Sequence, residues 1–113
     1  MATREISFGP LAGLMVLDLT NRVAGGTSTS HLADFGAQVI KVERPQGGDL
    51  LRAWGPFKEE VSIWWMVLSR NKKSITLNLS EVQGQEILKK LVAYCDVVIE
   101  AFRAGTMQKW GLG

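Results

Sequence analysis

A segment near the amino terminus, Thr20–Gly26, combines residue types that suit the binding of an anion. Its adjacent glycines permit close approach to the backbone, and a helix that begins here offers unpaired N–H groups. Glu43 follows Gly25 at about the 20-residue spacing at which dinucleotide-binding folds place a ribose-binding acid. The glycine fingerprint of those folds is incomplete, because Thr27 and Ser30 occupy its second and third glycine positions. The segment is therefore either an anion-binding loop or a turn that only joins a strand to a helix.

A second candidate for anion contact is the cationic run Arg70–Lys73, with three positive charges in four residues. It follows an amphipathic, tryptophan-containing stretch. The run can meet the phosphates of a nucleotide-like ligand, and the alternative is a solvated surface loop. Lys41, Arg44 and Lys109 are further cations at the ends of predicted strands or helices, and each alone is expected to be a surface charge.

The single histidine and the single cysteine indicate no metal or nucleophilic centre. His31 has no cysteine nearby with which to share a metal. Ser28 and Ser30 are neighbours of His31 on one short segment and cannot face it as a catalytic triad requires. Cys95 cannot form an internal disulfide, which fits a reducing compartment, so we expect a cytoplasmic protein without a metal.

The elements that must position these residues follow from the hydrophobic pattern. The apolar run Leu14–Leu19 predicts a buried strand, and Gln38–Val42 predicts a second one. Between them we expect a helix capped by Thr27 or Ser28 that extends through Phe35. A strand, a helix and a strand within about 30 residues are typical of a βαβ unit with parallel strands.

The rest of the sequence continues this alternation. Ser74–Leu79 alternates apolar and polar residues and predicts a third strand, and Asp96–Glu100 predicts a fourth. Helices are expected over 62–70 and from 104 onward, and the capping-box pattern of Ser80 and Gln83 predicts a helix that begins there. That helix should bury four apolar residues at helical spacing, Ile87, Leu88, Leu91 and Val92. The predicted fold class is α/β, with a Rossmann-like, mainly parallel sheet and flanking helices.

Composition excludes several classes of protein. The chain has 113 residues, 46% hydrophobic and 21% charged, which suits one globular domain or part of one. Its net charge of +2 is too small to indicate a nucleic-acid binder. The longest apolar run, residues 61–68, is far shorter than the roughly 20 residues that span a bilayer. The first ten residues contain Arg4 and Glu5 and lack an apolar core, so we expect no secretory signal and no membrane partner.

A series of short segments, taken in order, resembles one protein family. The segments are Pro10–Gly13, Val16–Thr20, Ala24-Gly25, Leu32–Ala37, Val39–Pro45, Gly48-Asp49, Arg52, Trp54–Pro56, Arg70–Ile75, Asp96–Glu100, Phe102-Arg103, Gly105, Met107 and Gly111–Gly113. Together they resemble the amino-terminal part of the class III coenzyme A transferases, the CaiB/BaiF family that includes formyl-CoA transferase and carnitine CoA-transferase.

The resemblance implies a Rossmann-like large domain whose sheet this chain begins, in an interlocked homodimer. It implies transfer of coenzyme A from an acyl-CoA to a small carboxylic acid through covalent aspartyl intermediates. The catalytic aspartate of the family matches none of the chain's four aspartates, Asp18, Asp34, Asp49 and Asp96, so no catalytic residue is expected here. We therefore expect residues 1–12 to be a lead-in and residues 13–113 to form a partial CoA-binding domain without its catalytic region.

By the same resemblance, part of the CoA nucleotide site falls within the chain. The implied contacts are Val23, Ala24, Arg44, Leu77, Asn78, Leu79, Ser80, Ala101, Phe102, Arg103 and Lys109. The sequence departs from the family pattern at four positions, where Gly26 and Ala104 replace prolines, Ser80 a lysine and Ala101 an asparagine.

Three other interpretations are weighed against the transferase. An α-methylacyl-CoA racemase tends to have a shortened stretch before the basic loop, whereas residues 48–69 are full length here and favour the transferase. A non-catalytic CoA- or nucleotide-binding module differs only in lacking a nucleophile-bearing continuation. A dinucleotide-dependent oxidoreductase is disfavoured, because the glycine fingerprint is missing.

Overall fold

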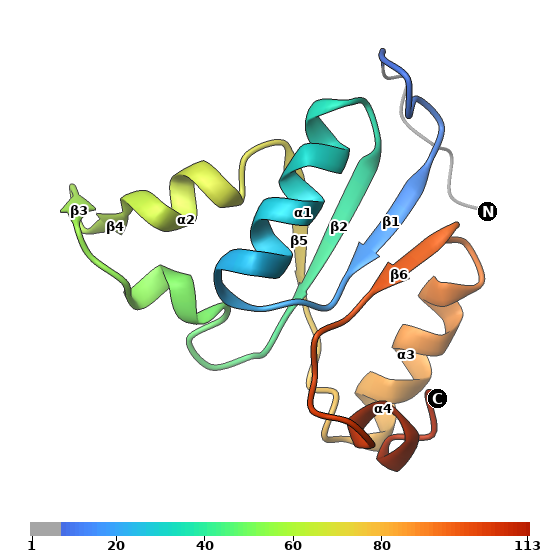
Figure 1. Ribbon diagram of the computed structural model, residues 1–113. Helices are drawn as coiled ribbons and strands as arrows, with labels where there is room; N and C mark the ends of the chain where they lie inside the picture. The colour runs from blue at the N-terminus through green and yellow to red at the C-terminus, as the bar shows by residue number, and fades with distance from the viewer. Residues whose placement is uncertain (1–7) are drawn as a thin grey trace.

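The computed structural model describes residues 8–113, in which four parallel strands form one sheet in the order β5-β2-β1-β6 (Figure 1). In chain order these strands are the third, second, first and fourth, as in the first half of a Rossmann fold. The predicted α/β class and mainly parallel sheet are confirmed. The elements are β1 (Met15–Asp18), α1 (Arg22–Asp34), β2 (Gln38–Glu43), the 3₁₀ helix η1 (Leu50–Ala53), β3 (Phe57–Lys58), β4 (Val61–Ser62), α2 (Ile63–Leu68), β5 (Lys72–Thr76), α3 (Val82–Val92), β6 (Val97–Ile99) and α4 (Thr106–Lys109).

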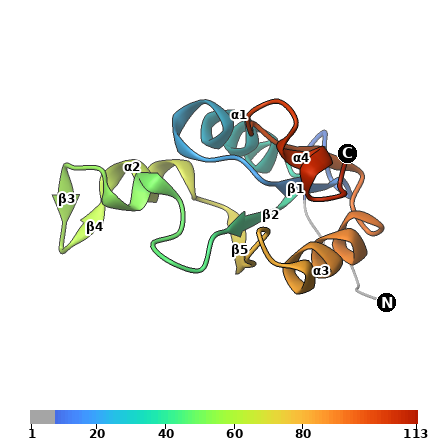
Figure 2. The ribbon, with the colours of Figure 1, turned by 90° about the horizontal axis from the view of Figure 1, so that it is seen from below.

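The two longer helices cover opposite faces of the sheet. Figure 2 shows α1 on one face and α3 on the other, with the antiparallel β3–β4 hairpin and α2 projecting to one side. The end of α2 is attached to α1, because the Ser30 hydroxyl donates to the Leu68 carbonyl oxygen at 2.7 Å. Among residues 8–113 the helices are too short or too polar to cross a membrane. Most of the predicted lead-in, residues 1–7, lies outside the described residues.

Helix α1 begins earlier than predicted, at Arg22, and the expected caps Thr27 and Ser28 lie inside it. Asn21 caps the helix instead, since its Oδ1 accepts from the Arg22 N–H at 3.1 Å. Gly25 is a helical residue packed against the end of β1, where a Cβ atom would overlap the Thr20 side chain. The glycine therefore provides close helix–strand contact. The prediction that Gly25 and Gly26 form a turn between the first strand and the helix was wrong, because both lie inside α1.

The two faces of the sheet differ in chemistry. On the α1 face, Val16 and Val39 pack against Ala33 near the amino ends of the strands. Toward the carboxyl ends the same face carries Asp18 and Lys41, both buried. The α3 face carries an apolar cluster, formed by Leu17, Leu19, Ile40, Val42, Ile75 and Leu77 around the fully buried Leu88.

Helix α3 and strand β5 differ in detail from their predictions. Strand β5 begins at Lys72, so part of the predicted basic loop is strand. Helix α3 begins at Val82 without a side-chain cap. The residues before it form a turn instead, in which the Ser80 N–H donates to Asn78 Oδ1 at 3.1 Å. The capping-box prediction was wrong. Of the four apolar residues expected to be buried on α3, Leu88 is buried, Leu91 is half-buried, and Ile87 and Val92 are exposed.

Candidate functional site

The carboxyl ends of the four parallel strands meet at one edge of the sheet, and two cavities open there. One, of about 220 Å³, lies between the segments after β1, β2 and β5 and reaches Phe102 and Trp110. The other, of about 300 Å³, lies between the segments after β1 and β6. The order of strands reverses between β1 and β6, and ligands of open α/β sheets bind at such a switch point. This carboxyl edge is the candidate site.

The structure brings several of the predicted contact residues together at the carboxyl edge. Arg44, Leu79 and Phe102 line the first cavity, and Ala101, Phe102 and Arg103 line the second. Asn78 lies with Arg44 in an adjoining groove. These placements put the side chains within reach of one ligand.

The remaining predicted residues contribute differently. Val23 and Ala24 lie in the first turn of α1, whose N–H groups have no acceptor within the helix. Leu77 packs into the apolar cluster on the α3 face. Ser80 and Lys109 are exposed and lie outside both cavities.

Asp18 and Lys72 form a buried ion pair beneath the middle of α1, at Gly26 and Thr29. The distance from Lys72 Nζ to Asp18 Oδ2 is 3.3 Å, and the side chains are 2% and 0% exposed. The Thr29 hydroxyl donates to Asp18 Oδ2 at 2.7 Å and accepts from Lys72 Nζ at 2.6 Å. Burial lowers the pKa of Lys72, an effect that attraction by Asp18 opposes and repulsion by Lys41 reinforces. The expectation of a solvated loop is therefore wrong for Lys72.

Glu43, at the end of β2, is bound on both carboxylate oxygens. Arg52 donates from Nε and Nη2 to its two oxygens, each at 2.8 Å, and Ser74 donates its hydroxyl. Burial favours the neutral acid, but the hydrogen bonds from Arg52, Ser74 and the Asp49 N–H, with the Arg52 charge, prevail and lower the pKa of Glu43 to about 2. The position that suggested a ribose-binding acid thus holds a structural carboxylate.

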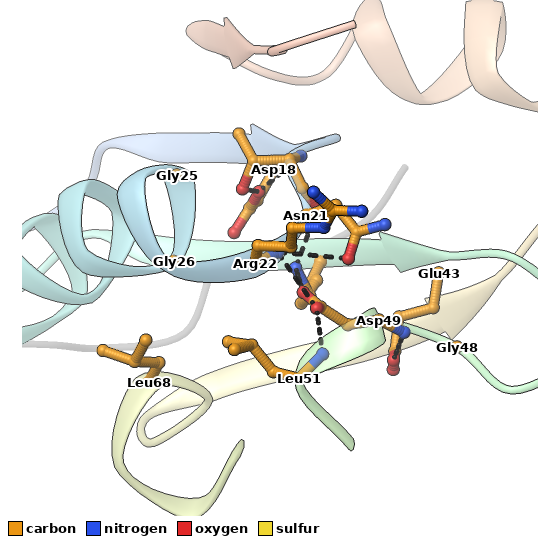
Figure 3. Close-up of polar contacts among 12 residues, drawn as sticks. Asp18, Asn21, Arg22, Gly25, Gly26, Glu43, Gly48, Asp49, Leu51 and Leu68 are labelled. Atoms are coloured by element: carbon orange, nitrogen blue, oxygen red, sulfur yellow. Dashed lines mark hydrogen bonds and ion pairs between the residues drawn. The ribbon is translucent and has the colours of Figure 1, made fainter. Parts of the chain in front are cut away.

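A second buried pair joins Lys41 and Asp49, with 2.7 Å between Lys41 Nζ and Asp49 Oδ2. Asp49 Oδ1 accepts from the N–H groups of Arg22, at 3.1 Å, and Leu51, at 2.9 Å (Figure 3). Lys41 also donates to the Thr20 carbonyl oxygen at 3.0 Å. The pair therefore connects β2 to the segment that starts α1.

The sequence-based expectation that Lys41 is a surface charge was wrong, since the residue is only 2% exposed. The sequence did contain a signal for burial, which is the alternation of side chains between the two faces of a strand. Lys41 and Glu43 alternate with Ile40 and Val42, so both lie on the same face as the buried Val39. Each buried charge on that face needs a counter-charge, but the alternation of side chains does not identify the residue that provides it.

The carboxyl edge offers groups that bind an anion beside an aromatic ring. Arg22 and Arg103 line the cavity at the switch point. Phe102 and Trp110 meet edge to face with ring centroids 5.2 Å apart. Asp18, Glu43 and Asp49 are engaged in ion pairs, which suits them to hold the structure, and Glu100 accepts from the Phe102 N–H at 2.8 Å. Across residues 8–113, His, Cys, Asp and Glu side chains do not gather in groups of three that can hold a metal ion.

The sheet order defines a Rossmann-like α/β fold, and comparison with known proteins places it in a family. The family model described as CoA-transferase family III matches residues 11–113. The chain belongs to this family.

Relatives and solved structures agree with that assignment. The succinyl-CoA–D-citramalate CoA-transferase of Chloroflexus aurantiacus is 50% identical over 105 residues, which are 92% of this chain and 26% of that protein. The succinyl-CoA:glutarate CoA-transferase of Mus musculus is 46% identical over 108 residues, 95% of this chain and 25% of that protein. A crystal structure of a CAIB/BAIF family protein from Brucella suis superimposes with a TM-score of 0.85 at 41% identity, over 93% of this chain and 29% of that one. The chain thus spans about a quarter of the length of the curated relatives it matches.

Proposed function

We propose that the carboxyl edge of this sheet binds the nucleotide half of coenzyme A and that the chain supplies this part of a family III CoA-transferase. The observation that carries the proposal is the cavity at the switch point, which Arg22 and Ala101–Arg103 line. Beside it, Arg44 Nε donates to the Gly48 carbonyl oxygen at 2.9 Å, which holds the guanidinium near the first cavity.

The chemistry of coenzyme A suits this edge. Its 3′-phosphate and pyrophosphate are anions that arginine forks bind through charge-assisted hydrogen bonds. Its adenine is a flat apolar ring, and Leu79, Phe102 and Trp110 provide apolar and aromatic walls in the first cavity. The N–H groups of Val23 and Ala24 add donors at the amino end of α1.

For the complete enzyme we propose succinyl-CoA as donor and a small dicarboxylic acid as acceptor. The basis is the activity named for the relatives, which pair succinyl-CoA with D-citramalate or glutarate. In such a transfer a carboxylate attacks the thioester carbonyl, the CoA thiolate leaves, and the resulting anhydride exchanges its acid before the thiolate returns. The assembly proposed for that enzyme is a homodimer in the cytoplasm.

We propose that the nucleophile is not among the aspartates of this chain. Asp18 and Asp49 are buried in ion pairs, and Asp34 is paired with Arg70 at 2.6 Å. Asp96 accepts from the Met15 N–H at 2.8 Å. The chain alone, given succinyl-CoA and glutarate, should form no glutaryl-CoA by mass spectrometry, and measurable turnover would overturn this assignment.

Calorimetric titration of the chain with coenzyme A, 3′,5′-ADP and NAD tests the binding proposal. Coenzyme A and 3′,5′-ADP should bind, and NAD should not compete, because the dinucleotide fingerprint is missing. Arg44→Gln should weaken CoA binding by about tenfold through loss of a charge-assisted contact, whereas the control Arg70→Gln, on a surface pair, should not. Absence of CoA binding to the unaltered chain would refute the proposal.

A further inference from the structure

We propose that Asp49 is a positioning residue for coenzyme A: it holds the backbone at the start of α1 in the conformation that aims the N–H groups of Val23 and Ala24 at the ligand. The inference rests on the proposed function, because it assigns a cause to the geometry of that site. Asp49 itself acts through the backbone it holds.

One carboxylate connects three segments. Asp49 Oδ1 accepts from Arg22 N–H at the start of α1 and from Leu51 N–H in η1. Asp49 Oδ2 is 2.7 Å from Lys41 Nζ on β2, and its side chain is 1% exposed. The backbone N–H of Asp49 donates to Glu43 Oε1 at 2.8 Å, so the backbone that carries the Asp49 carboxylate is also held. Oδ1 thus holds two neighbouring segments by hydrogen bonds (Figure 3), and Oδ2 holds β2 through the ion pair.

Arg22 requires such support because its backbone is unusual. Its φ of 66° lies in the left-handed region, which a residue with a side chain occupies only when its surroundings hold it there. The Arg22 N–H is held by Asp49 Oδ1 and by Asn21 Oδ1, each at 3.1 Å. Asn21 Oδ1 also accepts from the Leu50 N–H at 2.9 Å, so the two loops brace each other.

The conformation of Arg22 sets the direction of the first helical turn. Val23 and Ala24 are the next residues of α1, and first-turn N–H groups point out of the helix along its axis. A change at Arg22 rotates these groups relative to the cavity between the segments after β1 and β6. A buried carboxylate beneath the loop therefore determines the geometry of the cavity at the switch point, which Asp49 itself does not line.

The test separates the acceptor oxygen from the charge. Asp49→Ala removes both, and Asp49→Asn leaves Lys41 buried without a counter-charge. The double variant Lys41→Gln with Asp49→Asn keeps an Oδ1 acceptor for the Arg22 N–H and pairs two neutral amides. Asp34→Ala, at the far end of α1, is the control, because it removes only an exposed ion pair.

Two readouts are measured for each variant of the chain: CoA affinity by calorimetry, and hydrogen exchange of the amides in residues 20–26. Asp49→Ala should weaken CoA binding by about tenfold, and the double variant should recover to within about twofold of the unaltered chain. Exchange at residues 20–26 should rise in Asp49→Ala and return in the double variant, while residues 97–99 stay protected. Unchanged affinity in Asp49→Ala, or a double variant that regains thermal stability but not affinity, would overturn the inference.

Failure of the proposed function gives a different result. If the unaltered chain binds no coenzyme A, the binding proposal and its assigned ligand fall together. Hydrogen exchange of the ligand-free variants then still decides whether Asp49 holds the backbone of Arg22. Equal exchange in all variants would show that it does not.

Discussion

The two faces of this sheet bury different kinds of side chain. The α3 face is held by an apolar cluster with Leu17, Val42 and Leu88 among its buried residues. The α1 face is apolar only near the amino ends of the strands, and toward the carboxyl ends it buries charge. There two buried ion pairs, Asp18–Lys72 and Lys41–Asp49, lie between the sheet and α1, and Glu43 forms a third, partly exposed pair with Arg52 of η1.

The difference indicates what each face is for. Apolar packing stabilises without fixing the direction of any one hydrogen bond. Buried ion pairs contribute little net stability, because desolvation offsets attraction, but they fix the groups around them in place. The charged half of the α1 face lies next to the candidate ligand edge, where backbone direction matters. We infer that one face provides stability and the other provides geometry.

Breaking one ion pair should give the largest loss of stability. Lys72→Met leaves Asp18 buried without its counter-charge and should lower the free energy of unfolding by about 3–5 kcal/mol. Urea denaturation measures the change. Lys58→Met, on the exposed β3–β4 hairpin, is the control and should change stability by less than about 0.5 kcal/mol. Similar values for the two variants would mean that the pair is not buried in solution.

Truncation on the apolar face should cost somewhat less. Leu88→Ala removes a fully buried side chain from α3 and should lower the free energy of unfolding by about 2–4 kcal/mol. Ile87→Ala, its neighbour on the same helix, is 46% exposed and should cost less than about 1 kcal/mol. Both are measured by the same denaturation, and equal losses would contradict the assignment of the α3 face.

The adjacent glycines of α1 allow a finer comparison. Gly25→Ala forces a Cβ into the Thr20 side chain and should destabilise the chain by about 1–3 kcal/mol. Gly26→Ala places its Cβ 3.5 Å from Leu68 Cβ, an ordinary contact, and should be neutral or stabilise by up to about 1 kcal/mol. Thermal melts should therefore give a lower Tm for Gly25→Ala than for Gly26→Ala, and equal losses would contradict the closer packing of Gly25 against Thr20.

Acid should weaken the charged face in a range set by Glu43. Its pKa is lowered from 4.5 to about 2, so the folded state binds fewer protons than the unfolded state between these values. The stability that Glu43 contributes is complete above pH 4.5 and is lost as pH falls toward 2. Glu43→Gln should flatten this part of the pH dependence in denaturation at pH 5, 4 and 3. An unchanged slope would place the acid sensitivity elsewhere.

How much the sequence could predict differs between the same two faces. The four strands of the parallel sheet and the family followed from apolar runs and from the ordered segments, whereas the short strands β3 and β4 were not predicted. The buried state of Lys41 and Lys72 did not, because Lys41 was expected to be a surface charge and Lys72 to lie in a basic loop, and neither partner was known. Those partners, Asp49 and Asp18, are brought close by the fold and not by sequence spacing. Local rules also misplaced the starts of α1 and α3, where Asn21 and Asn78 provide the hydrogen bonds instead.

Hydrogen exchange with and without coenzyme A tests the central claim, that the carboxyl edge is the ligand edge, most directly. Mass spectrometry of the chain should show slower exchange at residues 20–26 and 100–103 when coenzyme A is added. The opposite edge provides the internal reference, since a separate cavity of about 520 Å³ lies there near Gln38 and Asn71, and exchange at residues 36–38 should not change. Protection confined to residues 36–38 and 71–73, with none at 20–26, would contradict the account.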